Sequence, residues 1–146
     1  MANLSSIHTL TELCTRQSEE AVVRLGQANQ NHHNALEKLQ ILKDYHHNYA
    51  ERLQDDMANG LNMNHYNNFV GFLSNLEKAV AQQEREVSLS LYVLEQQRNE
   101  WQQYERKRLS FDTLKSRAVK KQQNIENRRE QKLNDEFAER SKRIIL

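Results

Sequence analysis

The sequence predicts an all-α protein, a long antiparallel two-helix coiled-coil hairpin with an extended C-terminal helix. The 146 residues include no proline and only three glycines, so almost nothing interrupts a helix outside one short segment. Hydrophobic residues make up 37% of the chain and charged residues 28%, a balance too polar for a compact globule of this length. The core must therefore be a narrow seam, and we treat 1–146 as a single coiled-coil domain.

The first helix is expected over about residues 3–56. Either Asn3 or a capping box from Thr9 to Glu12 can satisfy the free amide groups at its N-terminus. Apolar residues then recur at alternating spacings of three and four or their multiples, with Thr11, Ser18, His32 and His46 as polar members. The apolar members of this pattern are Leu4, Ile7, Cys14, Ala21, Leu25, Ala28, Ala35, Leu39, Leu42, Tyr49 and Leu53.

A hinge is expected over about residues 57–63, where the Asn59-Gly60 pair tolerates a positive φ. Asn62 or Asn64 can cap the second helix, which is expected over about residues 64–142. Its apolar pattern comprises Tyr66, Val70, Leu73, Val80, Val87, Leu91, Leu94, Trp101 and Tyr104, and continues more weakly through Phe111, Leu114, Ala118, Ile125, Leu133 and Phe137.

The second expected helix is longer than the first, so its C-terminal part must extend beyond the N-terminus of the first helix. With a turn near residue 59, antiparallel partners have numbers that add to about 118, and residues beyond about 116 have no partner. Residues 105–146 carry 13 basic and seven acidic groups, a net charge of +6. This excess favours contact with an acidic surface, although a solvated helix face of mixed charge remains the alternative.

Several function classes are excluded by pattern. No glycine-rich phosphate loop is present, and two helices form no water-excluding pocket, so we expect no catalytic residue and no cofactor. The histidine pairs are adjacent in sequence rather than four residues apart, which argues against a metal site. The chain has no apolar run long enough to span a membrane and no signal peptide at its start, so a cytoplasmic location is expected.

Nucleic-acid binding through the basic tail is also disfavoured. Zipper proteins place a nearly pure basic region before their heptads. Here the basic segment follows the heptads, and from residue 116 onward five acidic groups are interleaved among nine basic ones. We therefore expect protein partners and no nucleic acid.

The hinge-proximal part of both helices carries more apolar residues than one seam can bury. If the seam comprises Leu39, His46, Leu53, Val70, Leu73 and Val80, a neighbouring stripe remains, formed by Leu42, Tyr45, Tyr49, Phe72, Leu76 and Ala79. An exposed aromatic and aliphatic stripe ordinarily marks a protein interface. A broad seam or a dimer of hairpins would explain the same residues.

Several clusters together give the sequence a family resemblance: Leu39 to Tyr49, Asn59-Gly60, Phe72 to Ala79, Trp101 and Gln131 to Arg140. Over nearly its full length the chain resembles the bacterial flagellar export protein FliJ family. The resemblance implies a non-enzymatic, stalk-like component of the flagellar type III export apparatus, needed for motility. The location implied is the cytoplasmic face of the inner membrane at the flagellar base, with only peripheral contact with the membrane.

The resemblance also implies partners. These are the export ATPase hexamer, the cytoplasmic linker of the export-gate membrane protein, and the export chaperones that are recycled. The implied gate-binding stripe is Lys38, Leu42, Tyr45, Tyr49, Phe72, Leu76, Ala79 and Gln83, with lysine and glutamine at positions 38 and 83 where the family has glutamine and histidine. The basic residues expected to face the ATPase ring are Arg106, Arg108, Lys120, Lys121, Arg128 and Arg129. A virulence-type secretion stalk or a generic coiled-coil scaffold remains the alternative.

Overall fold

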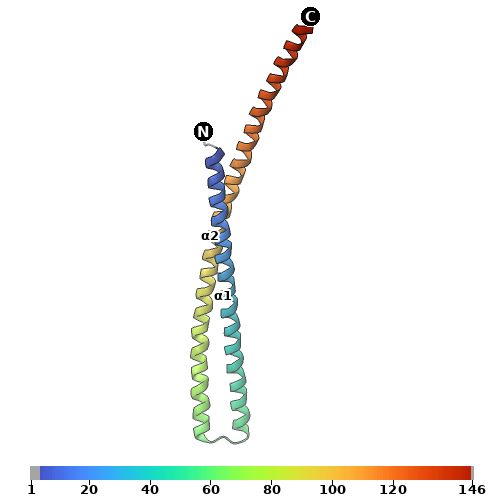
Figure 1. The fold of residues 1–146 in the computed structure, drawn as a ribbon. Helices are drawn as coiled ribbons and strands as arrows, with labels where there is room; N and C mark the ends of the chain where they lie inside the picture. Colours follow the sequence, from blue (N-terminus) through green and yellow to red (C-terminus); the bar gives the residue numbers. More distant parts are fainter. Residues whose placement is uncertain (1–3, 146) are drawn as a thin grey trace. The chain divides into compact units, whose positions relative to one another are not determined.

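The computed structural model describes residues 4–145, which form two α-helices and no strand. Helix α1 spans Leu4–Ala58 and helix α2 spans Met63–Ile145, so the helices contain 55 and 83 residues. Figure 1 shows α1 and α2 joined by a short connection, with the chain direction reversed. The predicted all-α hairpin is confirmed. Helix α1 ends two residues after the expected residue 56, and α2 extends one residue before and three residues beyond the expected range 64–142. No helix in this described part is long and apolar enough to cross a membrane.

The expected capping box at Thr9 is wrong, because α1 is already helical five residues earlier. The Thr9 hydroxyl donates a hydrogen bond of 3.0 Å to the backbone carbonyl of Ser5, as a threonine inside a helix commonly does. Asn3, the alternative cap, lies outside the described residues.

The turn between the helices is built as the sequence predicts. Gly60 has a φ of 85°, a left-handed value that glycine adopts without steric cost. Asn62 then caps α2, because its side-chain oxygen accepts a 2.7 Å hydrogen bond from the backbone amide of Asn64. The backbone carbonyl of Asn62 also accepts a hydrogen bond from the backbone amide of Tyr66, and this is the first regular hydrogen bond of α2.

The chain divides into two compact units. One unit is the hairpin Ala21–Trp101, which contains the turn. The other pairs the N-terminal turns of α1, up to Glu20, with α2 from Gln102 onward.

A heptad seam runs along α1. Its buried and half-buried side chains recur at strictly alternating spacings of four and three, including the predicted polar members. Cys14, Ala21 and Ala28 are at most 4% exposed, so small side chains form the most buried part of the seam. The full set is Ile7, Thr11, Cys14, Ser18, Ala21, Leu25, Ala28, His32, Ala35, Leu39, Leu42, His46, Tyr49, Leu53 and Asp56.

The seam of α2 differs from the prediction at several positions. Val70 and Leu91, both expected in the seam, are 43% and 42% exposed. Phe69 and Ser90, each one residue earlier, occupy the half-buried positions instead. The seam comprises Tyr66, Phe69, Leu73, Leu76, Val80, Gln83, Val87, Ser90, Leu94, Gln97, Trp101, Tyr104, Arg108, Phe111, Lys115 and Ala118.

The register between the helices is shifted by a few residues from the expected one. In the hairpin unit, Arg24 and Glu100 form an ion pair of 3.3 Å, and their numbers add to 124. The rings of Tyr49 and Phe72 also pack together, and the residue numbers of this pair add to 121. Because the turn is centred between residues 60 and 61 rather than at 59, partner numbers add to slightly more than the predicted 118.

Beyond Ala118, α2 has no packed face. Every side chain from residue 119 to residue 140 is exposed. The expectation that residues past about 116 lack a partner on α1 therefore agrees with the burial pattern to within two residues. This part of α2 keeps its helix without an intramolecular core.

Candidate protein-binding surfaces

The hinge-proximal surface of the hairpin carries a cluster of aromatic rings, which we call the ring cluster: Tyr45, Tyr49, Phe69 and Phe72. The ring centroids of Tyr49 and Phe72 are 4.4 Å apart, and those of Tyr49 and Phe69 are 6.1 Å apart. Tyr45 stacks on Tyr49 at 6.3 Å with an interplanar angle of 18°. Such separations suit favourable offset or tilted aromatic packing.

Two members of the ring cluster remain open to solvent. Tyr45 is 53% exposed and Phe72 is 40% exposed. Tyr49 is half-buried between them in the seam. Partner numbers that add to about 118 would set Tyr45 opposite Phe72, whereas the structure places Tyr49 against Phe72 because of the shifted register. Three predicted positions, together with Phe69, thus form a supported aromatic surface rather than two parallel stripes.

The division between seam and stripe was wrong for part of the stripe. Leu76 is only 9% exposed, and Leu42 and Tyr49 also occupy seam positions. Leu76 is therefore a core residue that lies beneath the exposed surface. Ala79 is half-buried beside the seam.

Gln83 and Lys38, at one end of the predicted stripe, border one surface groove. Gln83 is 6% exposed, and its side-chain amide donates a 2.9 Å hydrogen bond to the backbone carbonyl of Ala35. Lys38 is exposed and lines the same groove, of about 500 Å³, together with Glu86. Lys38 is thus accessible to a partner, whereas the Gln83 side chain is nearly buried and its amide is already hydrogen-bonded within the hairpin.

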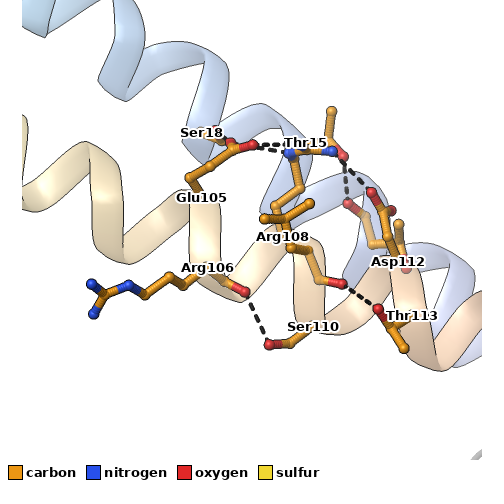
Figure 2. Close-up of polar contacts among 10 residues, drawn as sticks. Thr15, Ser18, Glu105, Arg106, Arg108, Ser110, Asp112 and Thr113 are labelled. Atoms are coloured by element: carbon orange, nitrogen blue, oxygen red, sulfur yellow. Dashed lines mark hydrogen bonds and ion pairs between the residues drawn. The ribbon is translucent and has the colours of Figure 1, made fainter.

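In the other unit a polar network joins the two helices (Figure 2). The Ser18 hydroxyl donates a 2.6 Å hydrogen bond to Oε2 of Glu105. Arg108 forms ion pairs with Glu105 and, at 2.9 Å, with Asp112. The hydrogen bond from Arg108, followed by that from Ser18, lowers the pKa of Glu105 from 4.5 to about 2.

This network changes the interpretation of the basic residues predicted to face an ATPase. Arg108 is half-buried in the seam, and its guanidinium is engaged with two carboxylates. It holds the fold together and is poorly placed to bind a partner. The other five predicted residues are exposed along α2: Arg106, Lys120, Lys121, Arg128 and Arg129.

The histidines and acids form no metal site in the described part of the chain, where no group of three or more possible ligands is brought together. His46 instead approaches Glu77 at 3.3 Å across the seam, and the ring nitrogen of His32 lies 3.0 Å from the Ser90 hydroxyl. These side chains contribute polar contacts between the helices.

Two features were missed by the sequence analysis. Phe69 was not assigned to the seam, although strict alternation of three and four from Tyr66 would have placed it there. Ile144, near the end of α2, was not named although it is 84% exposed, and Leu133 and Phe137, which belong to the weaker apolar pattern, are 64% and 73% exposed. Their spacing of four and seven residues was the available signal.

Comparisons with known proteins agree with this architecture. The family model described as "Flagellar FliJ protein" matches residues 4–143. The Flagellar FliJ proteins of Escherichia coli (strain K12) and Salmonella typhi are each 30% identical to this chain over 141 residues. Each match covers 97% of this chain and 96% of the relative. The chain therefore belongs to the flagellar FliJ family, whose members are non-enzymatic components of the flagellar export apparatus.

Proposed function

We propose that this chain is an adaptor that links the export ATPase ring to the cytoplasmic linker of the export gate. It binds the gate through the hinge-proximal surface of the hairpin and the ATPase through the C-terminal part of α2. It also assists the recycling of export chaperones. The chain acts at the cytoplasmic face of the inner membrane, where its contact with the membrane is indirect.

The main support for the gate contact is that the Tyr45 and Phe72 rings are exposed while both pack against Tyr49. Both rings are about half open to solvent, yet each packs on Tyr49, which is anchored in the seam. Aromatic anchors of this kind lose little conformational freedom on binding and often dominate an interface. The surface is therefore ready to receive a partner without rearrangement of the hairpin.

The buried members of the implied stripe have a different role in this proposal. Leu76 and Gln83 are 9% and 6% exposed, so they offer little area to a partner. They hold the two helices at the spacing that presents the rings. Their replacement would weaken gate binding by disturbing the hairpin, whereas loss of Tyr45 or Phe72 would remove a contact.

The ATPase contact is supported by the exposed C-terminal part of α2. All side chains from residue 119 to residue 140 are exposed, and this segment includes four of the predicted basic residues, Lys120, Lys121, Arg128 and Arg129. A long helix without a packed face is only marginally stable in isolation. A partner that covers this segment would therefore also order it.

The test of the gate contact compares Tyr45→Ala and Phe72→Ala with Tyr92→Ala, a matched control. Tyr92 is 60% exposed in the same hairpin unit but lies outside the predicted stripe. Calorimetric titration with the purified gate linker gives the affinity, and thermal melts give the stability. We expect each stripe variant to weaken binding by more than about 1 kcal/mol and the control to bind like the wild type.

Two results would count against the gate contact. If Phe72→Ala unfolds the hairpin while the folded fraction binds normally, Phe72 is a core residue and not an anchor. If Tyr92→Ala weakens binding as much as Tyr45→Ala, the linker lies on another face. Failure of the wild type to bind either the linker or the ATPase would instead favour a generic scaffold.

A further inference from the structure

The N-terminal part of α1, residues 4–20, packs against α2 with few large apolar side chains, and we call this segment the strap. Its seam consists of Ile7, which is half-buried, and of Thr11, Cys14 and Ser18, each at most 5% exposed. In the hairpin unit the same face of α1 also carries leucine and tyrosine side chains. Because burial of apolar area is the main attraction between packed helices, the strap is held more weakly than the rest of α1.

Packing between the strap and α2 is also open along one side. A groove of about 570 Å³ lies there, lined by six polar or charged residues of the strap and by Asp112 and Lys115 of α2. The three leucines of the strap, Leu4, Leu10 and Leu13, are each more than 40% exposed, so they contribute little to the seam. Polar side chains that border such a groove exchange their contacts for water at little net cost when the helices separate.

A polar contact fastens the inner end of the strap (Figure 2). The Ser18 hydroxyl donates a 2.6 Å hydrogen bond to Oε2 of Glu105. Nε of Arg108 donates to the same oxygen at 3.1 Å, and the guanidinium is held in turn by Asp112 at 2.9 Å. The Glu105 carboxylate is therefore oriented by residues of α2, and hydrogen bonds to a charged acceptor are among the stronger ones. We call Ser18, Glu105 and Arg108 the latch.

We infer that the strap is released from α2 as one unit while the hairpin unit stays folded, and that the latch controls this release. Among the described residues of the strap, Ile7 alone offers a large apolar side chain to the seam, so little apolar area holds the strap once the latch opens. Release exposes Tyr104 and Phe111, which are half-buried seam residues of α2 in the same compact unit. The strap is thus a removable cover over these two rings, whichever partners the chain binds.

Fraying of α1 from its N-terminus is the alternative, and the position of the latch distinguishes the two. Ser18 stands four residues after Cys14, at the inner end of the strap. Fraying would expose Cys14, which is 2% exposed, while the latch stays closed. Release as one unit requires the latch to open first. The chain has a single cysteine, so the reactivity of its thiol reports the opening of the strap.

The experiment uses the full chain and follows the reaction of Cys14 with an aromatic disulfide reagent under native conditions. Hydrogen exchange of peptides around Leu94, which is 5% exposed, reports opening of the hairpin unit in parallel. The test variant is Ser18→Ala, which removes the latch hydroxyl and favours the helix. The matched control is Thr9→Ala, which removes an exposed hydroxyl that bonds within α1. A third variant, Thr11→Val, replaces a buried hydroxyl of the strap seam with a methyl group.

We expect the wild-type strap to open at Cys14 at least about a hundredfold more often than the hairpin opens around Leu94. Ser18→Ala should speed Cys14 labelling at least about threefold, and Thr11→Val should slow it, without a change around Leu94. Thr9→Ala should label no faster than the wild type. Equal opening at Cys14 and Leu94 would show that strap and hairpin unfold together, and unchanged labelling in Ser18→Ala would assign it to fraying. Either result would overturn the inference.

A double variant and a footprint test the latch and the cover. If Ser18 acts through Glu105, Ser18→Ala/Glu105→Ala should label Cys14 no faster than Glu105→Ala alone, because both changes remove the same contact. Effects that multiply would show that the two residues act independently, and would overturn the latch. Hydroxyl-radical oxidation of Tyr104 and Phe111 should rise together with Cys14 labelling in Ser18→Ala. Oxidation that does not follow the labelling would overturn the role of the strap as a cover.

Discussion

The side-chain amide of Gln83 on α2 donates a 2.9 Å hydrogen bond to the backbone carbonyl of Ala35 on α1. Gln83 is only 6% exposed, so a polar group occupies a position where the heptad pattern usually has an apolar one. Loss of the partner of this buried amide would cost about 1–3 kcal/mol. The contact therefore selects one alignment of the two helices, and with it the alignment of the ring cluster.

We expect Gln83→Leu to stabilise the hairpin by about 1 kcal/mol while loosening its register, because leucine packs in a heptad seam without requiring one alignment. Urea denaturation measures the stability. Spin labels at Arg24 and Glu100, which pair at 3.3 Å, report the alignment through the width of their distance distribution. Gln82→Leu, at the neighbouring exposed position, should change neither quantity. A marked loss of stability in Gln83→Leu would show that the hydrogen bond outweighs apolar burial.

Leu76→Ala should destabilise the protein by about 2–5 kcal/mol, because Leu76 is 9% exposed and its truncation leaves a cavity in a narrow seam. Leu89→Ala provides the matched comparison in the same helix and unit. Leu89 is 58% exposed, so its truncation should change stability by less than about 0.5 kcal/mol. Chemical denaturation of both variants distinguishes them. Equal effects would mean that Leu76 does not pack between the helices.

Glu105 should make the unit near the N-terminus sensitive to acid. Its pKa in the folded chain, about 2, lies below the ordinary value of 4.5, so the folded state binds fewer protons between these values. Its contribution to stability is therefore complete above about pH 4.5 and is lost as the pH falls towards about 2. Thermal melts of Glu105→Gln should show a smaller loss of stability over this range than the wild type.

The control for the acid response is Glu95→Gln, which alters an exposed carboxylate on the same helix. This variant should retain the acid sensitivity of the wild type. Ser18→Ala should retain part of it, because the hydrogen bond from Arg108 is the larger cause of the lowered pKa. Identical acid profiles for Glu105→Gln and the wild type would assign the loss of stability to other carboxylates.

Backbone amides from residue 119 to residue 140 should exchange with solvent much faster than those around Leu94. Leu94 is 5% exposed in the seam, whereas every side chain in the 119–140 segment is exposed, so local opening there disrupts no packing. Hydrogen exchange followed by mass spectrometry of peptides measures the difference. Added ATPase should slow exchange in the C-terminal peptides. Strong protection of these amides in the free monomer would indicate a contact absent from this structure.

The sequence by itself determined the two helices, the turn and the exposed C-terminal segment. The reasons are local. An uninterrupted heptad pattern favours long helices, and Asn59-Gly60 suits a turn with a left-handed residue. Because α2 is longer than α1, its C-terminal part extends beyond the residues that α1 can cover. Most of the α1 seam was found in the same way. The family resemblance, and three of the four aromatic positions of the ring cluster, also came from residues visible in the chain.

Only the tertiary structure decided which of the adjacent apolar residues near the turn are core and which are surface. Neighbouring candidates such as Phe69 and Val70 are both apolar, so composition cannot choose between them. The choice depends on the supercoil and on an offset of a few residues between helices, which follow from how side chains of both helices interlock. Because successive residues are separated by about 100° around a helix, the rotation of α2 about its own axis places Leu76 in the seam and leaves Phe72 at the surface.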